Sequence, residues 1–242
     1  MTAIHNEVPR RERARTATIE EIKATALQLM RETGTTDARF TDIARAMGMT
    51  PPALYRYFGD RDELLTALIT DAYDDLGATV AEARDAVGDG DIGGRWLEAA
   101  EAYRQWAHRE PQQFALIFGL PVPGYLAPQE GPTTEAASRA MSQLAALFTE
   151  AQVTGKLRHP LVRVVDPAFT KCAESEAKFS AIPPENFQAM MHAWASLHGF
   201  TCLEAFHHLD WMEPDARDAL FRAQVLMAGK AAGLPSPSRR RV

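Results

Sequence analysis

Residues 41–58, Thr-Asp-Ile-Ala-Arg-Ala-Met-Gly-Met-Thr-Pro-Pro-Ala-Leu-Tyr-Arg-Tyr-Phe, form the stretch that decides the fold. They predict two short helices joined by a tight turn. Thr41 is expected to cap the first helix, and Gly48 to end it, because glycine adopts the left-handed conformation at little cost. Thr50 and Pro51 then predict the start of the second helix. The apolar face of the first helix is formed by Ile43, Ala44 and Met47. Two short helices joined by such a glycine-containing turn are typical of a helix-turn-helix.

The second helix is predicted to contact DNA, since the second helix of a helix-turn-helix normally enters the major groove. We expect it to be about two turns long and to carry Tyr55, Arg56 and Tyr57 as hydrogen-bond donors. Arg56 suits guanine or a phosphate, and the Thr41 hydroxyl suits a phosphate. A helical hairpin within some other all-helical domain is the alternative. The predicted DNA-binding residues are Thr41, Thr50, Pro51, Pro52, Ala53, Tyr55, Arg56, Tyr57 and Arg61.

An amphipathic helix is predicted before this motif, over residues 16–33. Thr18 and Glu21 form a capping box at its expected start, and Gly34 ends it. Residues 1–12 are expected to form a loose arm. The basic residues around the end of this arm are Arg10, Arg11, Arg13 and Arg15. Two interpretations stay open: the arm contacts a phosphate backbone or minor groove, or it is a solvated terminus.

A long helix is predicted over residues 60–88, with Asp60 and Glu63 as its capping signal. The leading helix, the helix-turn-helix with Leu54-Tyr55-Arg56-Tyr57-Phe58, and the following Asp62-Glu63-Leu64-Leu65 together resemble the tetracycline-repressor (TetR) family of bacterial regulators. The resemblance covers residues 13–80. It implies an all-α homodimer with an N-terminal DNA-binding domain and a larger C-terminal domain that binds a small molecule.

The resemblance also implies roles for individual residues. Tyr55 matches a family tyrosine that hydrogen-bonds to phosphate, and Tyr57 matches a position that contacts the groove. Arg61 matches a basic position that clamps the DNA backbone. Gly59 stands where many members have Lys, which puts one phosphate contact in doubt.

The charge distribution suits a basic head on an acidic body. The 242-residue chain has a formal net charge of −6. Residues 8–61, however, hold ten Lys and Arg against seven Asp and Glu, whereas residues 62–242 hold 16 against 24. Such a head would face DNA, although a helical enzyme can show the same pattern by chance. With no long apolar run, no signal-peptide core and only two cysteines, we expect a cytoplasmic protein without membrane contact.

Three parts are expected along the chain: an arm and helix-turn-helix domain at residues 1–59, a helical regulatory and dimerisation domain at 60–234, and a disordered tail at 235–242. Gly88–Gly94 should end the helix over residues 60–88, and the Pro- and Gly-rich residues 121–132 should form a loop. The last two helices are apolar on more than one face, so they are predicted to build the dimer. Further helices are predicted at 95–110, 114–120, 133–155, near 168–179, 184–208 and 214–233.

Residues 194–200, Trp-Ala-Ser-Leu-His-Gly-Phe, resemble the Trp-His-Gly (WHG) motif of one TetR C-terminal subclass. Trp194 and His198 share a helix face, and Gly199 predicts the close approach of another helix. We expect a small, mainly apolar effector to bind under the 121–132 loop, with plain core packing as the alternative role of its aromatic side chains. The predicted ligand-binding residues are Trp96, Tyr103, Phe114, Phe118, Tyr125, Phe148, Trp194 and His198.

No spacing of His, Cys, Asp or Glu indicates a metal site, and neither a phosphate-binding glycine loop nor a nucleophile elbow is present. No catalytic residue, metal or cofactor is therefore predicted. The sequence predicts a ligand-responsive transcriptional repressor that leaves double-stranded operator DNA when its effector binds. Two alternatives stay open: an all-helical small-molecule-binding protein or enzyme that has lost DNA binding, or an adaptor that binds another protein through its acidic body.

Overall fold

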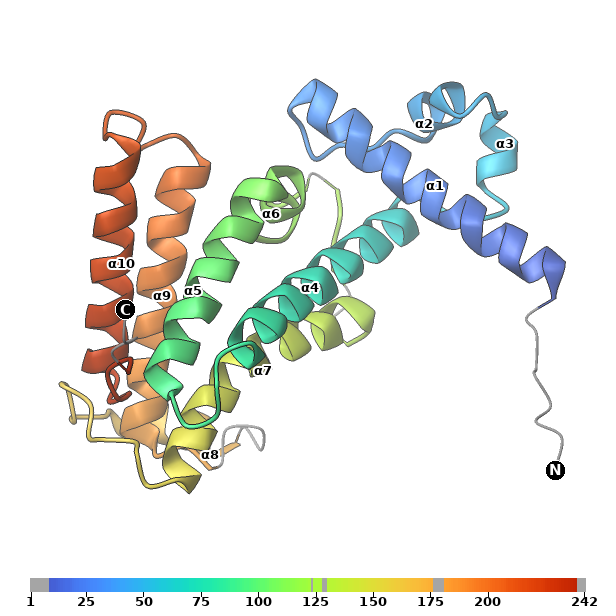
Figure 1. The fold of residues 1–242 in the computed structure, drawn as a ribbon. Helices are drawn as coiled ribbons and strands as arrows, with labels where there is room; N and C mark the ends of the chain where they lie inside the picture. Colours follow the sequence, from blue (N-terminus) through green and yellow to red (C-terminus); the bar gives the residue numbers. More distant parts are fainter. Residues whose placement is uncertain (1–8, 123, 128–129, 176–180, 239–242) are drawn as a thin grey trace, which may run out of the picture. The chain divides into compact units, whose positions relative to one another are not determined.

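All regular structure is helical in this computed structural model, which describes residues 9–122, 124–127, 130–175 and 181–238. The described residues form ten helices and no strand, so the all-α prediction is confirmed (Figure 1). Among these helices, none combines the length and apolarity that a membrane span requires. The helices are α1 (Arg10–Thr33), α2 (Phe40–Ala46), α3 (Pro51–Leu54), α4 (Arg61–Asp85), α5 (Ile92–Arg109), α6 (Pro111–Phe118), α7 (Pro132–Val153), α8 (Pro167–Ser175), α9 (Pro184–Ala205) and α10 (Pro214–Ala231).

The chain separates into two compact units. The first takes in residues 1–72 and 112–135, and the second takes in residues 73–111 and 136–242. Helices α1, α2 and α3 therefore belong to the first unit, and α5, α9 and α10 to the second. The domain limits expected from the sequence, with a boundary after residue 59, stay a prediction.

Several helix boundaries of the first unit are those that local signals predict. Gly34 follows α1 with a φ of 66°, and Gly48 follows α2 with a φ of 65°, a conformation that glycine adopts without steric cost. Thr50 occupies the N-cap of α3. At the start of α4 the Glu63 N–H donates to the Asp60 carboxylate at 2.8 Å, which confirms the capping signal.

The start of α1 differs from the prediction. The helix begins at Arg10, with Pro9 at its N-cap. Thr18 lies inside the helix, where its hydroxyl donates to the Ala14 carbonyl at 3.0 Å, so the predicted capping box is wrong. Arginine and alanine favour helix, which accounts for the earlier start. The expected arm is therefore helical from Arg10 onward, and residues 1–8 lie outside the described residues.

The start of α2 also differs. The helix begins at Phe40 with Arg39 at the N-cap, so Thr41 lies in the first turn and the predicted Thr41 cap is wrong. Phe40 is only 7% exposed, and its ring centroid lies 5.0 Å from that of Tyr55. Because burying this ring is favourable, α2 begins at Phe40, one residue before Thr41.

The second helix of the helix-turn-helix is shorter than predicted. α3 ends at Leu54, and residues 55–57 form turns. The Tyr57 N–H donates to the Leu54 carbonyl at 2.9 Å, a three-residue spacing typical of tighter 3₁₀ geometry. Arg56 and its two tyrosine neighbours thus follow the helix instead of lying within it.

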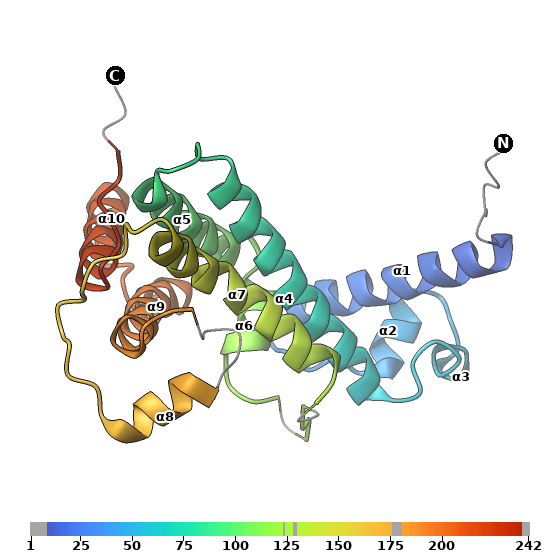
Figure 2. The same ribbon diagram turned by 90° about the horizontal axis from the view of Figure 1, so that it is seen from below.

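In the second unit, α5, α9 and α10 pack side by side (Figures 1 and 2). Trp106 of α5, Phe148 of α7 and Phe221 of α10 are completely buried. A Cβ atom added to Gly229 of α10 would lie 2.6 Å from the Trp96 Nε1 atom. Only glycine at this position lets α10 approach the Trp96 ring so closely.

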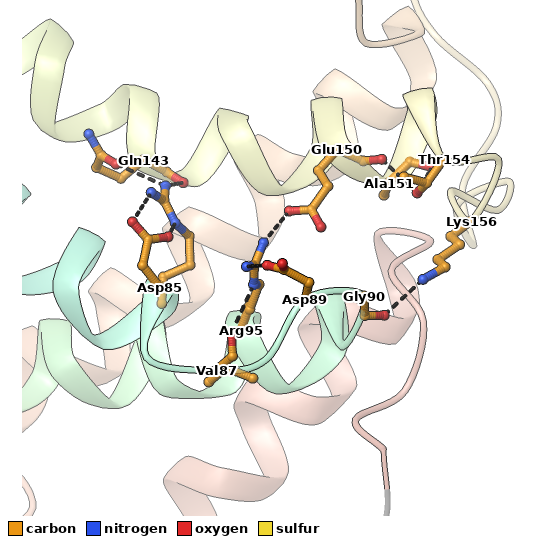
Figure 3. A network of polar contacts seen from close by, with 11 residues as sticks. Asp85, Val87, Asp89, Gly90, Arg95, Gln143, Glu150, Ala151, Thr154 and Lys156 are labelled. Carbon is orange, nitrogen blue, oxygen red and sulfur yellow. Dashed lines mark hydrogen bonds and ion pairs between the residues drawn. The ribbon is translucent and has the colours of Figure 1, made fainter.

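Arginines tie the end of α4 and the start of α5 to α7 (Figure 3). Arg84 donates to the Gln143 side-chain oxygen at 2.9 Å. Arg95 donates to Glu150 at 2.8 Å and to Asp89 at 2.7 Å. Both arginine side chains are largely buried, at 14% and 13% exposed, although Asp89, one partner of Arg95, is fully exposed. The bonds position the connection between the two helices.

Two expectations from the sequence are wrong: that Gly93 and Gly94 lie outside a helix, and that the tail is disordered from residue 235. Gly93 and Gly94 lie inside α5, because Asp91 caps the helix by accepting the Gly94 N–H at 2.9 Å. The Ser238 N–H also donates to Asp91, at 3.0 Å, and a Cβ on Gly93 would clash with the backbone around Pro235. Residues 235–238 are therefore ordered against α5 instead of disordered, and residues 239–242 lie outside the described residues.

Candidate nucleic-acid interface and effector site

The nine predicted DNA-binding residues all lie in the first unit, on α2, α3, the turns after α3, and the start of α4. Most of their side chains are open to solvent. Ala53, Tyr57 and Arg61 are half-buried, and the exposed ones are Thr41, Thr50, Pro51, Pro52, Tyr55 and Arg56. The structure thus presents these side chains as a largely accessible surface.

Tyr55 has a packing role as well as an exposed face. Its ring lies against Phe40 of α2, yet 55% of the residue is exposed. The ring is therefore held in place by α2 while the side chain stays accessible.

Arg15 of α1 contacts the turn that holds Arg56 and Tyr57. An Arg15 guanidinium N–H donates to the Arg56 carbonyl at 2.9 Å. The same guanidinium carbon lies 5.3 Å from the centroid of the Tyr57 ring, within range of a cation–π interaction. Sequence reasoning missed Arg15 as part of this site, because 41 residues separate it from Arg56 and no local pattern links them.

Arg61 is held by carboxylates on the protein itself. It donates to Asp37 at 2.8 Å, and another of its nitrogens lies 3.9 Å from Asp62. Its side chain is 29% exposed. A phosphate contact by Arg61 would therefore compete with the Asp37 ion pair.

In the second unit, α5 and α9 bring together three of the predicted ligand-binding residues. The Tyr103 hydroxyl lies 2.7 Å from the Nδ1 atom of His198. The rings of Trp194 and His198 are stacked, 4.9 Å apart with 3° between their planes. Cys202, one turn further along α9, places its sulfur 3.4 Å from the His198 Nε2 atom.

Burial sets the protonation of this cluster. It lowers the pKa of His198 and raises the pKa of Tyr103 and of the Cys202 thiol. All three groups are therefore neutral near pH 7. A neutral imidazole has one donor and one acceptor nitrogen, so Tyr103 can donate to Nδ1 while the Nε2 proton faces Cys202. The cluster presents aromatic and weakly polar groups without a net charge.

The other predicted ligand-binding residues have contacts of their own. The buried Trp96 indole donates to the Val225 carbonyl at 2.8 Å, and Phe148 is fully buried on α7. In the first unit, the rings of Phe114 and Phe118 lie 5.3 Å apart, and the Tyr125 hydroxyl lies 3.0 Å from that of Thr66.

The expectation for Gly199 is wrong. Among the residues of this chain that the structure describes, a Cβ atom added there would meet nothing within 4 Å, so no helix of the same chain approaches it closely. Gly229 of α10 does permit the close approach of another helix, and sequence reasoning did not single it out. Its partner Trp96 lies more than 100 residues away, and only the packing of α5 on α10 shows the relation.

Sequence reasoning also missed a buried ion network. Arg104 of α5 donates two bonds of 2.6 Å to Glu204 of α9 and one of 2.7 Å to Asp218 of α10. Burial opposes the charge on Arg104, but its bonds to the two carboxylates outweigh burial and raise its pKa. A charged residue two turns after Trp96, on the apolar face of the predicted helix, is the signal that could have drawn attention to it.

Two protein families match the chain. The family described as "Bacterial regulatory proteins, tetR family" matches residues 22–68, and the one described as "Tetracyclin repressor-like, C-terminal domain" matches residues 96–228. The C-terminal match does not confirm the WHG subclass that the sequence suggested.

Individual proteins agree with these matches. The HTH-type transcriptional regulators Rv1816 of Mycobacterium tuberculosis and Mb1846 of Mycobacterium bovis are each 37% identical over 147 residues, which is 57% of this chain. The match spans 61% of the length of these curated relatives. The crystal structure of the proposed regulatory protein SCO4313 is 33% identical with a TM-score of 0.72, covering 91% of this chain and 98% of that one. PfmR from Thermus thermophilus, a TetR family regulator, has the same fold: it is 19% identical with a TM-score of 0.53, over 86% and 96% of the chains.

Proposed function

The chain belongs to the tetracycline-repressor (TetR) family of bacterial regulatory proteins, and on that premise we propose that it is a transcriptional repressor that leaves its operator DNA when a small effector binds. It acts in the cytoplasm by binding and not by catalysis. The observation that carries the proposal is the exposed surface of α2, α3 and the turns after α3, where hydrogen-bond donors gather on a helix-turn-helix.

A homodimer would present two such surfaces to successive major grooves, about 34 Å apart. Helices α9 and α10 have apolar side chains on two faces. One set is buried in the core of the second unit, and the other set is exposed and available for a dimer. Phe221 and Val225 of α10 point into the second unit and are buried. The large apolar residues of the same two helices that stay exposed are Leu203, Leu220, Leu226 and Met227, with Phe206 directly after α9. Two copies that cover these side chains on each other would form a four-helix interface.

The effector site that we propose is centred on Tyr103, Trp194 and His198 in the second unit. Neutral polar groups beside stacked aromatic rings suit an apolar or aromatic ligand with one or two hydrogen-bonding groups. To release DNA, the ligand must bind the released conformation more tightly than the DNA-bound one.

A mobility-shift titration with the DNA upstream of the protein's own gene tests the proposal. Arg56→Ala should weaken binding by about 1–3 kcal/mol, or roughly 5- to 150-fold, if Arg56 contacts a base. Arg31→Ala is the control, because Arg31 is also exposed but bonds to Gln28 near the end of α1. If the wild type binds no DNA, the alternative of a ligand-binding protein without DNA binding is favoured. If Arg56→Ala and Arg31→Ala bind alike, the assigned DNA surface is wrong.

A further inference from the structure

A groove runs between the N-terminal part of α1 and the turns after α3. It has a volume of about 610 Å³ and lies wholly in the first unit. The residues that line it are Pro9, Arg11, Glu12, Ala14, Arg15, Thr18, Arg56 and Tyr57. The groove is thus continuous with the surface expected to contact DNA, because Arg56 and Tyr57 belong to both.

One face of α1 forms a wall of the groove. Arg11, Arg15 and Thr18 are spaced four and three residues apart, which places them on the same side of the helix. Arg15 holds this face against the turns after α3 through its bond to the Arg56 carbonyl and its position over the Tyr57 ring. Since α1 is helical from Arg10, Arg11 is presented by a regular element one turn from this anchor.

The groove carries a net positive charge. Three guanidinium groups and one carboxylate, that of Glu12, lie along it. Ion pairs of the first unit's other arginines include Arg39 with Asp37, Arg45 with Asp42 and Arg61 with Asp37.

Among the described residues, by contrast, no carboxylate pairs with Arg11, Arg15 or Arg56. A guanidinium without a carboxylate partner gives up no ion pair when it binds a phosphate, so the groove arginines can bind one at lower cost than Arg61 can.

We propose that this groove binds the phosphate backbone of duplex DNA beside the bases that α3 and its following turns contact, with Arg11 and Arg15 as the phosphate-binding residues. The inference rests on the proposed function and extends the interface beyond the helix-turn-helix. Phosphate contacts of this kind position the protein on the duplex and add affinity that does not depend on sequence.

The test is a salt titration of full-length protein binding to a fluorescein-labelled duplex of random sequence, about three helical turns long. Binding is followed by fluorescence anisotropy between about 50 and 200 mM KCl. Each phosphate contact contributes about 0.9 to the slope of log affinity against log salt. Arg11→Gln should make this negative slope shallower by about that amount for each protomer bound. The dissociation constant of the variant for the duplex should rise.

Arg13→Gln is the matched control. It removes the same charge from the same exposed stretch of α1, but Arg13 is two residues from both Arg11 and Arg15 and does not line the groove. Its salt slope should equal that of the wild type. A general loss of electrostatic attraction would change both variants equally.

The outcomes separate the inference from the proposed function. If Arg11→Gln keeps the wild-type slope, or if both variants lose slope equally, the groove does not bind DNA, while wild-type binding leaves the proposed function standing. If the groove binds another anionic partner in place of DNA, Arg11→Gln should keep the wild-type salt slope. If the wild type binds neither this duplex nor the DNA upstream of its gene, both proposals are overturned.

Discussion

Replacing Glu204 by Gln should destabilise the protein severely, because Glu204 is the buried centre of the ion network in the second unit. Its side chain is 0% exposed, and Arg104, which donates two bonds of 2.6 Å to it, is 8% exposed. The amide of Gln would place an NH₂ group against the guanidinium and leave a buried positive charge with one partner fewer. Removing one partner of a buried ion pair costs about 3–5 kcal/mol.

We expect the lower end of this range, about 3 kcal/mol, because the Asp218 carboxylate still accepts a bond from Arg104 at 2.7 Å. For a chain of this size such a loss lowers the Tm by roughly 6–12 °C. The assay is urea unfolding followed by tryptophan fluorescence, with all variants at the same protein concentration, since association would also change the apparent stability.

Asp218→Asn is the internal comparison. The Asp218 side chain is 65% exposed, so losing its charge should cost less than about 1 kcal/mol. The reasoning would be refuted by an E204Q variant within about 1 kcal/mol of the wild type, or by an Asp218→Asn variant as unstable as E204Q.

Three further outcomes are expected. Gly229→Ala should lose about 1–3 kcal/mol of stability, because the new methyl group would lie 2.6 Å from the Trp96 ring nitrogen. Gly199→Ala should gain about 0.5–1 kcal/mol, because its methyl group meets open space and alanine favours the helix more than glycine does. Urea midpoints of the two variants that do not differ in this order would contradict the packing described. Burial lowers the pKa of His198 below its ordinary value of 6.5, so the unfolded chain binds more protons below that pH and stability falls as the pH drops. The wild type should therefore lose more stability than His198→Gln between about pH 7.5 and pH 5 in urea titrations, and equal losses would count against a buried, neutral imidazole. Ala223→Glu, an exposed change on α10, should yield monomers by light scattering if α9 and α10 form the dimer, whereas a wild type that is already monomeric at about 10 μM would remove the proposed interface.

Local signals in the sequence determined most of the helices and several of their ends. Gly34 and Gly48 end α1 and α2 because the left-handed conformation is cheap for glycine, and Asp60 caps α4 because its side chain reaches a free N–H three residues on. These effects act over a few residues, so the order of amino acids contains them. The pattern of residues 41–58 likewise predicted a helix-turn-helix, and together with its neighbours over residues 13–80 it indicated the family.

Only the tertiary structure decided what depends on residues far apart in the chain. Burial of Phe40 overrode Thr41 as the cap of α2. Gly229, and not Gly199, lets another helix approach closely, because α10 packs against Trp96 of α5. Arg15 meets Arg56 across 41 residues, and Arg104 meets its carboxylate partner across 100. No local preference encodes such pairs, since each arises only when segments far apart in the chain pack together, and around Arg104 that packing also excludes water.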